Sequence, residues 1–160
     1  VKPTLDLILK LPGVKRCELK MGVRKIDGGY EACDFLDPNY WWRGIADLIV
    51  TNGHKAFVID YKTGKNAKYA DTKQLDLLAG ATFLHFPEIK TIKSALAYVV
   101  SNELIRKEHE HTKKEEYLEV FAKEVDRLDG ALASGVFNAV SGPLCGWCPV
   151  ESCEHWRDRR

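Results

Sequence analysis

The chain has 160 residues, of which 45% are hydrophobic and 29% are charged, and its 24 Lys and Arg nearly balance its 23 Asp and Glu. This composition excludes a disordered chain, which would be poorer in apolar residues, and a histone-like polycation. No run approaches the roughly 18 consecutive apolar residues that span a membrane, and the start, VKPTLDLILK, lacks the apolar core of a signal peptide. We therefore expect one domain over residues 1–160 that does not cross a membrane.

The first part of the chain is rich in strand signals. Residues 3–11 form a short apolar run, which predicts a helix or an irregular lead-in. Residues 18–25 alternate loosely and predict a strand. Two apolar runs, 44–50 and 56–61, flank Asn52-Gly53, a pair that favours a β-hairpin between them.

The second part adds two helices and one strand. Asp71 or Thr72 can cap a helix that runs to about His85. Residues 94–100 are apolar over the length of a strand that is buried on both faces, and residues 113–134 show the spacing of an amphipathic helix. The expected order is strand, strand, strand, helix, strand, helix. It predicts an α/β or α+β domain with a small mixed sheet flanked by helices.

Three charged residues on the predicted hairpin can support chemistry. Asp60 and Lys62 lie two apart on one strand and therefore share a face, and the hairpin brings Asp47 alongside Asp60. Two neighbouring carboxylates repel each other unless a cation lies between them, and Mg²⁺ or Mn²⁺ suits oxygen ligands. Lys62 could then orient water and stabilise charge on a phosphate. The alternative is an ordinary surface ion pair between Asp60 and Lys62.

The wider pattern favours the metal site. Gly44-x-x-Asp47, Asp60-Tyr61-Lys62-Thr63-Gly64 and a helix beginning near Gln74 occur in that order. The series GIADLIV, VIDYKTGK and QLDLL resembles the PD-(D/E)XK nuclease superfamily, in its RecB-like branch with phage exonucleases and CRISPR-associated nucleases. The resemblance covers residues 18–156 and implies a restriction-endonuclease-like core.

The resemblance assigns roles to individual residues. It makes Asp47 and Asp60 ligands of a catalytic Mg²⁺ or Mn²⁺, Lys62 the catalytic lysine and the backbone carbonyl of Tyr61 a further ligand. The family also places a Glu or His upstream on the metal side. Glu18 is our choice because it opens a predicted strand, whereas its competitor Glu31 lies in a turn-rich stretch.

The position of Gln74 on its predicted helix also indicates a role in the site. One helical face carries Gln74, Leu77, Leu78, Ala81 and Leu84. A buried amide needs partners, and a metal-bound water, a ligand carboxylate or a substrate phosphate would supply them. The alternative is that Gln74 only caps or packs the helix. RecB-like nucleases carry Gln-x-x-x-Tyr here, and Leu78 replaces that tyrosine, so its DNA contact is not carried over.

The tail, residues 141–160, contains Cys145-x-x-Cys148-x-x-x-x-Cys153-x-His155. Three thiols and an imidazole can form a tetrahedral Cys₃His zinc site, which we favour. Some RecB-like nucleases instead bind a [4Fe–4S] cluster through three such cysteines and one far upstream, here Cys17 or Cys33 or a residue before Val1.

Two other uses of the tail cysteines remain open. They could be free thiols in an apolar corner with Trp147 and Trp156. A thioredoxin-like redox role is disfavoured, because that chemistry requires the Cys pair after a strand and at the start of a helix.

Three further groups of residues complete the analysis. Residues 40–43, Tyr-Trp-Trp-Arg, could stack on unpaired bases or bury an indole at the start of a strand. His109 and His111 lie in the charged run 107–116, which we interpret as a solvated start of a helix. Cations near the proposed site that could contact phosphates are Lys65, Lys68 and Lys73.

The sequence therefore predicts a divalent-metal-dependent DNA nuclease, an exonuclease in preference to a site-specific endonuclease. The setting implied by the resemblance is DNA recombination, repair or phage DNA processing in the cytoplasm of a bacterial or phage-infected cell. DNA is the expected partner, with recombination or helicase proteins as further partners. The alternative is a non-catalytic nuclease-fold subunit that binds DNA within a larger helicase or recombination complex.

Overall fold

The computed structural model of the chain describes residues 2–65, 67 and 70–157. Its contacts divide the chain into two compact units, Val1–Ala122 and Lys123–Arg160. The single domain over residues 1–160 stays a prediction. Each unit is described by itself below.

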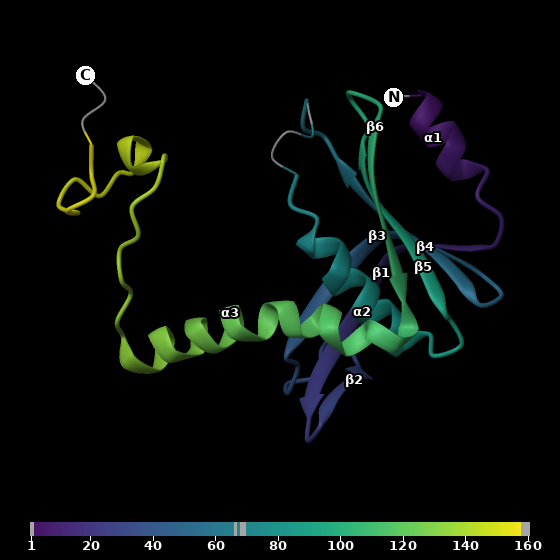
Figure 1. The fold of residues 1–160 in the computed structure, drawn as a ribbon, viewed down its shortest axis with the longest axis horizontal. Helices are drawn as coiled ribbons and strands as arrows, with labels where there is room; N and C mark the ends of the chain where they lie inside the picture. Colours follow the sequence, from purple (N-terminus) through teal and green to yellow (C-terminus); the bar gives the residue numbers. More distant parts are fainter. Residues whose placement is uncertain (1, 66, 68–69, 158–160) are drawn as a thin grey trace. The chain divides into compact units, whose positions relative to one another are not determined.

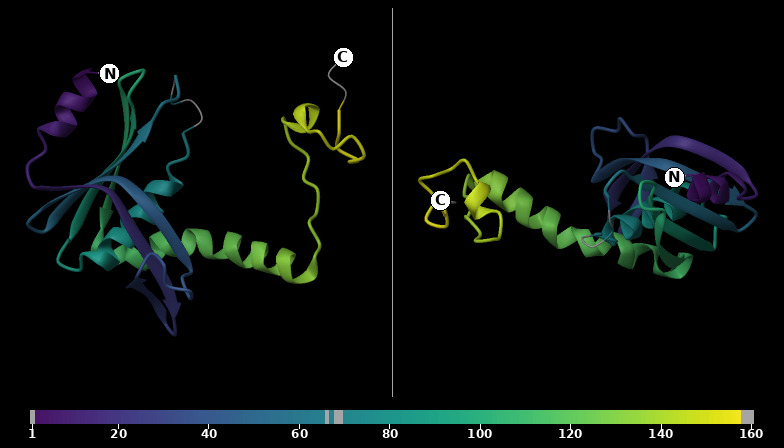
Figure 2. Two further views of the ribbon diagram at one scale, coloured as in Figure 1. Left: turned by 180° about the vertical axis from the view of Figure 1, so that it is seen from behind. Right: turned by 90° about the horizontal axis from the view of Figure 1, so that it is seen from above.

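The first unit is built on one sheet of six strands in the order β2-β1-β3-β4-β5-β6 (Figure 1). The strands are β1 (Val14–Ile26), β2 (Gly29–Cys33), β3 (Trp42–Asn52), β4 (Lys55–Lys62), β5 (Thr91–Tyr98) and β6 (Glu103–Glu110). Neighbours are antiparallel except β4 and β5, which are parallel. The sheet is strongly twisted when seen from behind and from above (Figure 2). The mixed sheet and the α+β class are thus as predicted.

Helices supply the crossover and the cover of the sheet. Parallel strands cannot be joined by a tight turn, and α2 (Lys73–His85) makes the connection between β4 and β5. One hydrophobic cluster joins the sheet to α2 and to the start of α3 (Lys114–Ser134) through Phe83 and Leu118. A second cluster joins α1 (Lys2–Leu9) to the sheet through Ile8. A third, small cluster joins Leu96 and Tyr98 of β5 to Leu75 of α2, so apolar residues of the sheet contribute to three clusters.

The local signals around the β3–β4 hairpin and α2 are confirmed. Asn52 pairs with Lys55 across a two-residue turn, in which Gly53 has a φ of +56° that glycine adopts without strain. The helix predicted to end near His85 does so. Before it, Asp71 rather than Thr72 supplies a side-chain bond, because its Oδ1 accepts from Lys73 N over 2.9 Å.

Two strands, β2 and β6, were not predicted from the sequence, and one interpretation was wrong. Strand β2 pairs with β1 across Asp27-Gly28, a hairpin signal that was available. Strand β6 covers residues 103–110, and its second half overlaps the run 107–116 that was interpreted as a solvated start of a helix. His109 is not solvated but 1% exposed, because β6 pairs with β5 and brings it under α2.

The pairing of β1 with β3 is interrupted at Glu18. The residues on both sides of Glu18 pair with β3, whereas Glu18 itself has a φ of +51° and does not pair. A left-handed backbone is uncommon for residues other than glycine. The register of the flanking pairs makes Asp47 the residue opposite Glu18.

The inside–outside alternation of β3 shifts at the same place. Ala46 and Ile49, three residues apart, belong to one hydrophobic cluster, whereas Leu48 belongs to the other. Strict alternation would place residues three apart on opposite faces. At Asp47, therefore, the side chains of β3 change which face of the sheet they point to.

The second unit contains the end of α3 and the short 3₁₀ helix η2 (Cys145–Trp147). The spacing predicted an amphipathic helix over 113–134, and the helix is confirmed. Leu118 and Ala122 are buried in the first unit, but Leu128 and Leu132 in the second are exposed. Among the described residues, no helix is long and apolar enough to cross a membrane.

Candidate active site

Asp47 and Asp60 lie at the point where the β3–β4 ladder ends. The last pair is Leu48 with Ile59, so the next register position sets Asp47 opposite Asp60. The ladder stops there because Asp47 Oδ2 accepts a hydrogen bond from the backbone nitrogen of Tyr61 over 2.7 Å. The two carboxylates are thus held next to each other by backbone geometry.

Lys62 joins the carboxylate pair to helix α2. Its Nζ lies 2.7 Å from Asp60 Oδ2 in an ion pair and donates to Gln74 Oε1 over 3.2 Å. The side chains of Asp60 and Lys62 are only 19% and 34% exposed. Partial burial strengthens their attraction compared with a surface pair. The shared face of Asp60 and Lys62 was expected from strand alternation, whereas the bond from Lys62 to Gln74 was not predicted.

Two polar atoms at this place lack a hydrogen-bond partner among the described residues. Asp60 Oδ2 is buried and, although it is ion-paired with Lys62, the angles do not make a hydrogen bond. Gln74 Nε2 is buried and unpaired as well. Buried polar groups are nearly always satisfied, so these atoms indicate a site built for something additional. Burial of the Tyr61 phenol raises its pKa, and the charges of Cys17 and Asp47 raise it further.

The two upstream glutamates lie in different places. Glu18 is exposed and occupies the register position opposite Asp47. Glu31, on β2, accepts a hydrogen bond from Arg24 Nε over 2.9 Å, and Asp37 binds the same guanidinium. Glu31 is therefore tied to Arg24, and Glu18 is the better placed of the two.

The oxygen donors at Asp47 and Asp60 fit a small divalent cation. Across residues 2–65, 67 and 70–157, no group of three or more His, Cys, Asp and Glu side chains lies close enough to hold a metal ion. Mg²⁺ does not require such a group, because it is usually held by one or two carboxylates, with waters and substrate phosphates as its other ligands. Asp60 Oδ2 is paired with Lys62 but accepts no hydrogen bond, and a cation could take up part of its negative charge.

The cysteine tail forms a hollow in the second unit. Its lining includes Cys145, Cys148, Cys153 and His155. All five cysteines of the chain are free, and Gly142 N donates to Cys145 Sγ over 3.2 Å. The side chains share one hollow but do not converge into a ligand set among the described residues. Zinc and iron–sulfur binding stay predictions.

Residues 40–43 divide between the core and the surface. Trp41 and Trp42 pack against the main hydrophobic cluster. Tyr40 is 41% exposed, and the guanidinium of Arg43 lies 4.4 Å from the centre of its ring. Of the lysines named near the site, Lys65 and Lys73 are exposed, and Lys68 lies outside the described residues.

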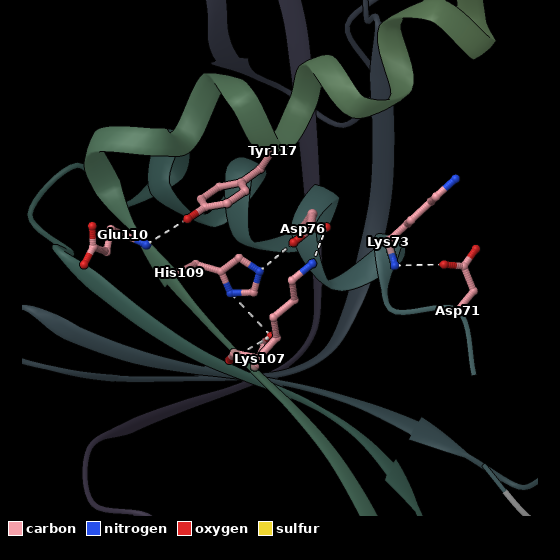
Figure 3. Close-up of polar contacts among 8 residues, drawn as sticks. Asp71, Lys73, Asp76, Lys107, His109, Glu110 and Tyr117 are labelled. Carbon is pink, nitrogen blue, oxygen red and sulfur yellow. Dashed lines mark hydrogen bonds and ion pairs between the residues drawn. The ribbon is translucent and has the colours of Figure 1, made fainter. Parts of the chain in front are cut away.

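A buried charged cluster next to the site was missed. Asp76, two residues after Gln74 on α2, lies between Lys107 and His109 of β6 (Figure 3). The distances are 2.6 Å from Lys107 Nζ to Asp76 Oδ2 and 2.9 Å from His109 Nε2 to Asp76 Oδ1. No local signal could reveal it, because its members are about 30 residues apart and meet only through the sheet.

Comparison with known families settles the superfamily. The sequence profile described as PD-(D/E)XK nuclease superfamily matches residues 17–153. The chain belongs to this superfamily. No curated protein sequence matches it significantly. A solved structure titled "Crystal structure of SSO0001" is similar, with a TM-score of 0.44 and 14% identity over 94% of this chain. This chain spans 65% of the length of that one.

Membership in the PD-(D/E)XK superfamily confirms the resemblance drawn from the Asp47, Asp60 and Lys62 pattern. Proteins of this superfamily are nucleases, and its members generally use Mg²⁺ or Mn²⁺. The six-stranded mixed sheet with its helices is consistent with the expected restriction-endonuclease-like fold. The RecB-like branch stays a prediction.

Proposed function

We propose that this PD-(D/E)XK protein is a Mg²⁺- or Mn²⁺-dependent deoxyribonuclease that degrades DNA from an end. The observation that carries the proposal is the set of contacts of Lys62. Its ammonium group lies 2.7 Å from Asp60 and 3.2 Å from Gln74, and Asp47 on β3 occupies the register position opposite Asp60. An ordinary surface ion pair would not include a hydrogen bond to a side-chain amide with a buried nitrogen.

The oxygen donors have the role of holding the cation. Asp47, Asp60 and the backbone carbonyl of Tyr61 are the proposed ligands. Glu18 on β1 is the proposed further residue on the metal side, although its side chain does not form one ligand group with the two aspartates. When bound, the cation supplies positive charge that stabilises the negative charge developing on the phosphate. Support comes from the Tyr61 N–Asp47 bond, which holds one carboxylate against the β4 backbone, and from the unsatisfied Asp60 oxygen.

Lys62 is the proposed catalytic residue of the chain itself. As an ammonium group it orients the attacking water and stabilises the phosphate charge in the transition state. Asp60 forms an ion pair with it, and Gln74 fixes its direction through one hydrogen bond. Gln74 Nε2, the other half of that amide, is free to donate to a phosphate oxygen or a water.

The finer parts of the proposal rest on family analogy. They are exonuclease activity, the RecB-like branch and a role in recombination, repair or phage DNA processing, with recombination or helicase proteins as partners. The proposed setting is the cytoplasm of a bacterial or phage-infected cell. Five free cysteines favour such a reducing compartment.

The tail has a separate proposed role as a structural metal site. Cys145, Cys148, Cys153 and His155 would complete a Cys₃His zinc site, and a [4Fe–4S] cluster is the alternative. Support comes from their common hollow and from the donor types. Metal analysis and the visible spectrum of the purified protein test this, because zinc is colourless, an iron–sulfur cluster is brown, and a metal-free protein contradicts both.

Hydrolysis of linear DNA tests the main proposal. The parent protein is incubated with end-labelled linear DNA and with closed circular DNA, in Mg²⁺ or Mn²⁺ and in EDTA. We expect cutting of the linear DNA alone, only with the metal. Lys62→Ala should lower kcat by about 10²- to 10³-fold, as loss of one charged stabilising group does. Lys93→Ala is the matched control, because Lys93 is exposed and pairs only with Glu108.

Three results would count against this reading. Cutting by Lys62→Ala at the parent rate removes the catalytic assignment. Cutting of closed circles makes the protein an endonuclease. Binding of DNA without cutting in either metal favours the non-catalytic DNA-binding subunit.

A further inference from the structure

Asp76 is a buried carboxylate that the proposed hydrolysis does not use. It is 6% exposed, and its partners are the ammonium group of Lys107 and the imidazole of His109, both on β6. Removing a carboxylate from water costs several kcal/mol, and well-packed apolar residues often hold two elements together equally well. The need to hold α2 on the sheet therefore does not by itself explain why this cluster is made of charged and polar side chains. Its directional bonds fix where the helix lies along β6, which apolar contacts specify less sharply.

The cluster lies at the end of α2 that carries Gln74. Gln74 and Asp76 are two residues apart in the first turn, so about 3 Å of helix rise separates them. Thr72 makes no side-chain capping bond, and the bond from Lys73 N to Asp71 is local (Figure 3). Besides the bond from Lys62 to Gln74, Asp76 therefore ties this turn to the sheet through two hydrogen bonds to β6.

The far end of α2 is tied separately. His85 Nε2 lies 2.8 Å from the carbonyl oxygen of Gly22 on β1. The remaining side-chain bond of the helix in the part of the chain that the structure describes, from Thr82 to Leu78 O, stays within α2. Side-chain bonds to the sheet therefore come from three residues of the helix, Gln74 and Asp76 in the first turn and His85 at the end.

Neighbouring elements orient the imidazole of His109. Ser94 Oγ on β5 lies 3.5 Å from Nδ1, and the ring of Tyr117 on α3 meets the imidazole edge-on at 4.9 Å. Tyr117 is fixed in turn, because its hydroxyl accepts from Glu110 N over 3.1 Å (Figure 3). A neutral imidazole with its proton on Nε2 donates to Asp76. Burial lowers the pKa of His109 in spite of Asp76 and favours this neutral form.

We propose that Asp76, held by Lys107 and His109, positions the first turn of α2 so that Gln74 keeps Lys62 aligned for hydrolysis. Asp76 is a positioning residue, because its partners are Lys107 and His109 and its effect passes through the Gln74–Lys62 bond. This inference rests on the proposed function. A displacement of about 1 Å at a reacting group can lower a rate about 100-fold, so loss of the cluster should be visible in kcat.

The kinetic test compares two aspartates at the start of the same helix. Asp76→Asn should lower kcat about 10- to 100-fold and leave KM within about twofold. Asp71→Asn is the matched control, because Asp71 is exposed and, within the part of the chain that the structure describes, bonds only to the backbone next to it. Equal kcat values for the two variants would overturn the proposal. Should Asp76→Asn fail to fold, Lys107→Met, which alters the half-exposed partner, takes its place with the same expectation.

A double-mutant cycle separates positioning from general destabilisation. If Asp76 acts through Gln74, adding Asp76→Asn to Gln74→Ala should change kcat by less than about threefold. A full additive loss in the double variant would show that Asp76 acts elsewhere, and would contradict the proposal.

A third readout needs no activity and distinguishes failure of this inference from failure of the proposed function. The side-chain amide signals of Gln74 are followed by NMR. Asp76→Asn should shift or broaden them, and Asp71→Asn should not. Unchanged signals in Asp76→Asn overturn the positioning role, whereas shifted signals in a protein that cuts no DNA support it and reject only the nuclease.

Discussion

Lys62 donates a hydrogen bond to Gln74 Oε1 over 3.2 Å, which joins the end of β4 to the first turn of α2. A hydrogen bond to a charged group contributes about 1.5–3 kcal/mol. If this bond is needed mainly in the transition state, Gln74→Ala should lower kcat about 10- to 150-fold with little change in KM. Thr72→Ala is the control, because its side chain makes no capping bond. A loss confined to KM would assign Gln74 to substrate binding instead.

Stability should depend on pH through His109. Burial lowers its pKa from 6.5, so below about pH 6.5 the unfolded chain takes up a proton that the folded protein does not. The free energy of unfolding should therefore fall as pH decreases below that value, by at most about 1.4 kcal/mol per pH unit for this group.

Urea unfolding of the parent and two variants between about pH 5 and pH 8 measures this dependence. His109→Gln should remove its share of the slope, and His54→Gln, which alters an exposed histidine, should leave the slope in place. The same slope in all three proteins would contradict the prediction.

Two glycines in helices should respond to alanine in opposite directions. A Cβ at Gly80 would lie 2.9 Å from two carbons of Leu118, where α2 meets α3, whereas Gly130 has nothing within 4 Å. Alanine in a helix gains about 1 kcal/mol over glycine, but overpacking costs about 1–3 kcal/mol. Gly80→Ala should therefore be neutral or destabilising, and Gly130→Ala should stabilise by up to about 1 kcal/mol. Thermal unfolding measures both, and a clear gain from Gly80→Ala would show that Leu118 yields easily.

Metal binding can be measured without cutting. Mn²⁺ at about 100 times its dissociation constant should stabilise the folded protein by about 2.7 kcal/mol, which raises Tm by about 5–10 °C. Asp60→Asn should lose most of this increase, because it removes one of the two carboxylates. Asp71→Asn should keep it. An equal increase in Asp60→Asn would place the Mn²⁺ elsewhere in the protein.

The parts of the site that could be predicted depend on short-range patterns. Asn52-Gly53 fixes the β3–β4 hairpin, and the hairpin fixes the register that sets Asp47 opposite Asp60. Alternation along β4 then places Lys62 on the face of Asp60. These steps need only the sequence and the period of a strand, which is why the prediction of these three neighbours agrees with the structure.

The parts that could not be predicted depend on distant pairing. Strand β6 has the sequence ELIRKEHE, in which charged residues predominate, and it forms because β5 offers it an edge. The burial of His109 follows from Asp76, 33 residues away in sequence. A run of charged residues predicts exposure to water when the segment is considered alone. A buried carboxylate that pairs with one of these residues allows that residue to be buried instead.

The left-handed backbone of Glu18 constrains how this protein can diverge. In that conformation a β-branched side chain is a steric outlier, whereas glycine, asparagine and aspartate adopt it most readily. Mutational drift at this position should therefore be channelled toward those three amino acids. Of them, aspartate alone would retain a carboxylate, on a shorter side chain. Replacement of Glu18 by glycine or asparagine would leave β1 without an acidic group at this position.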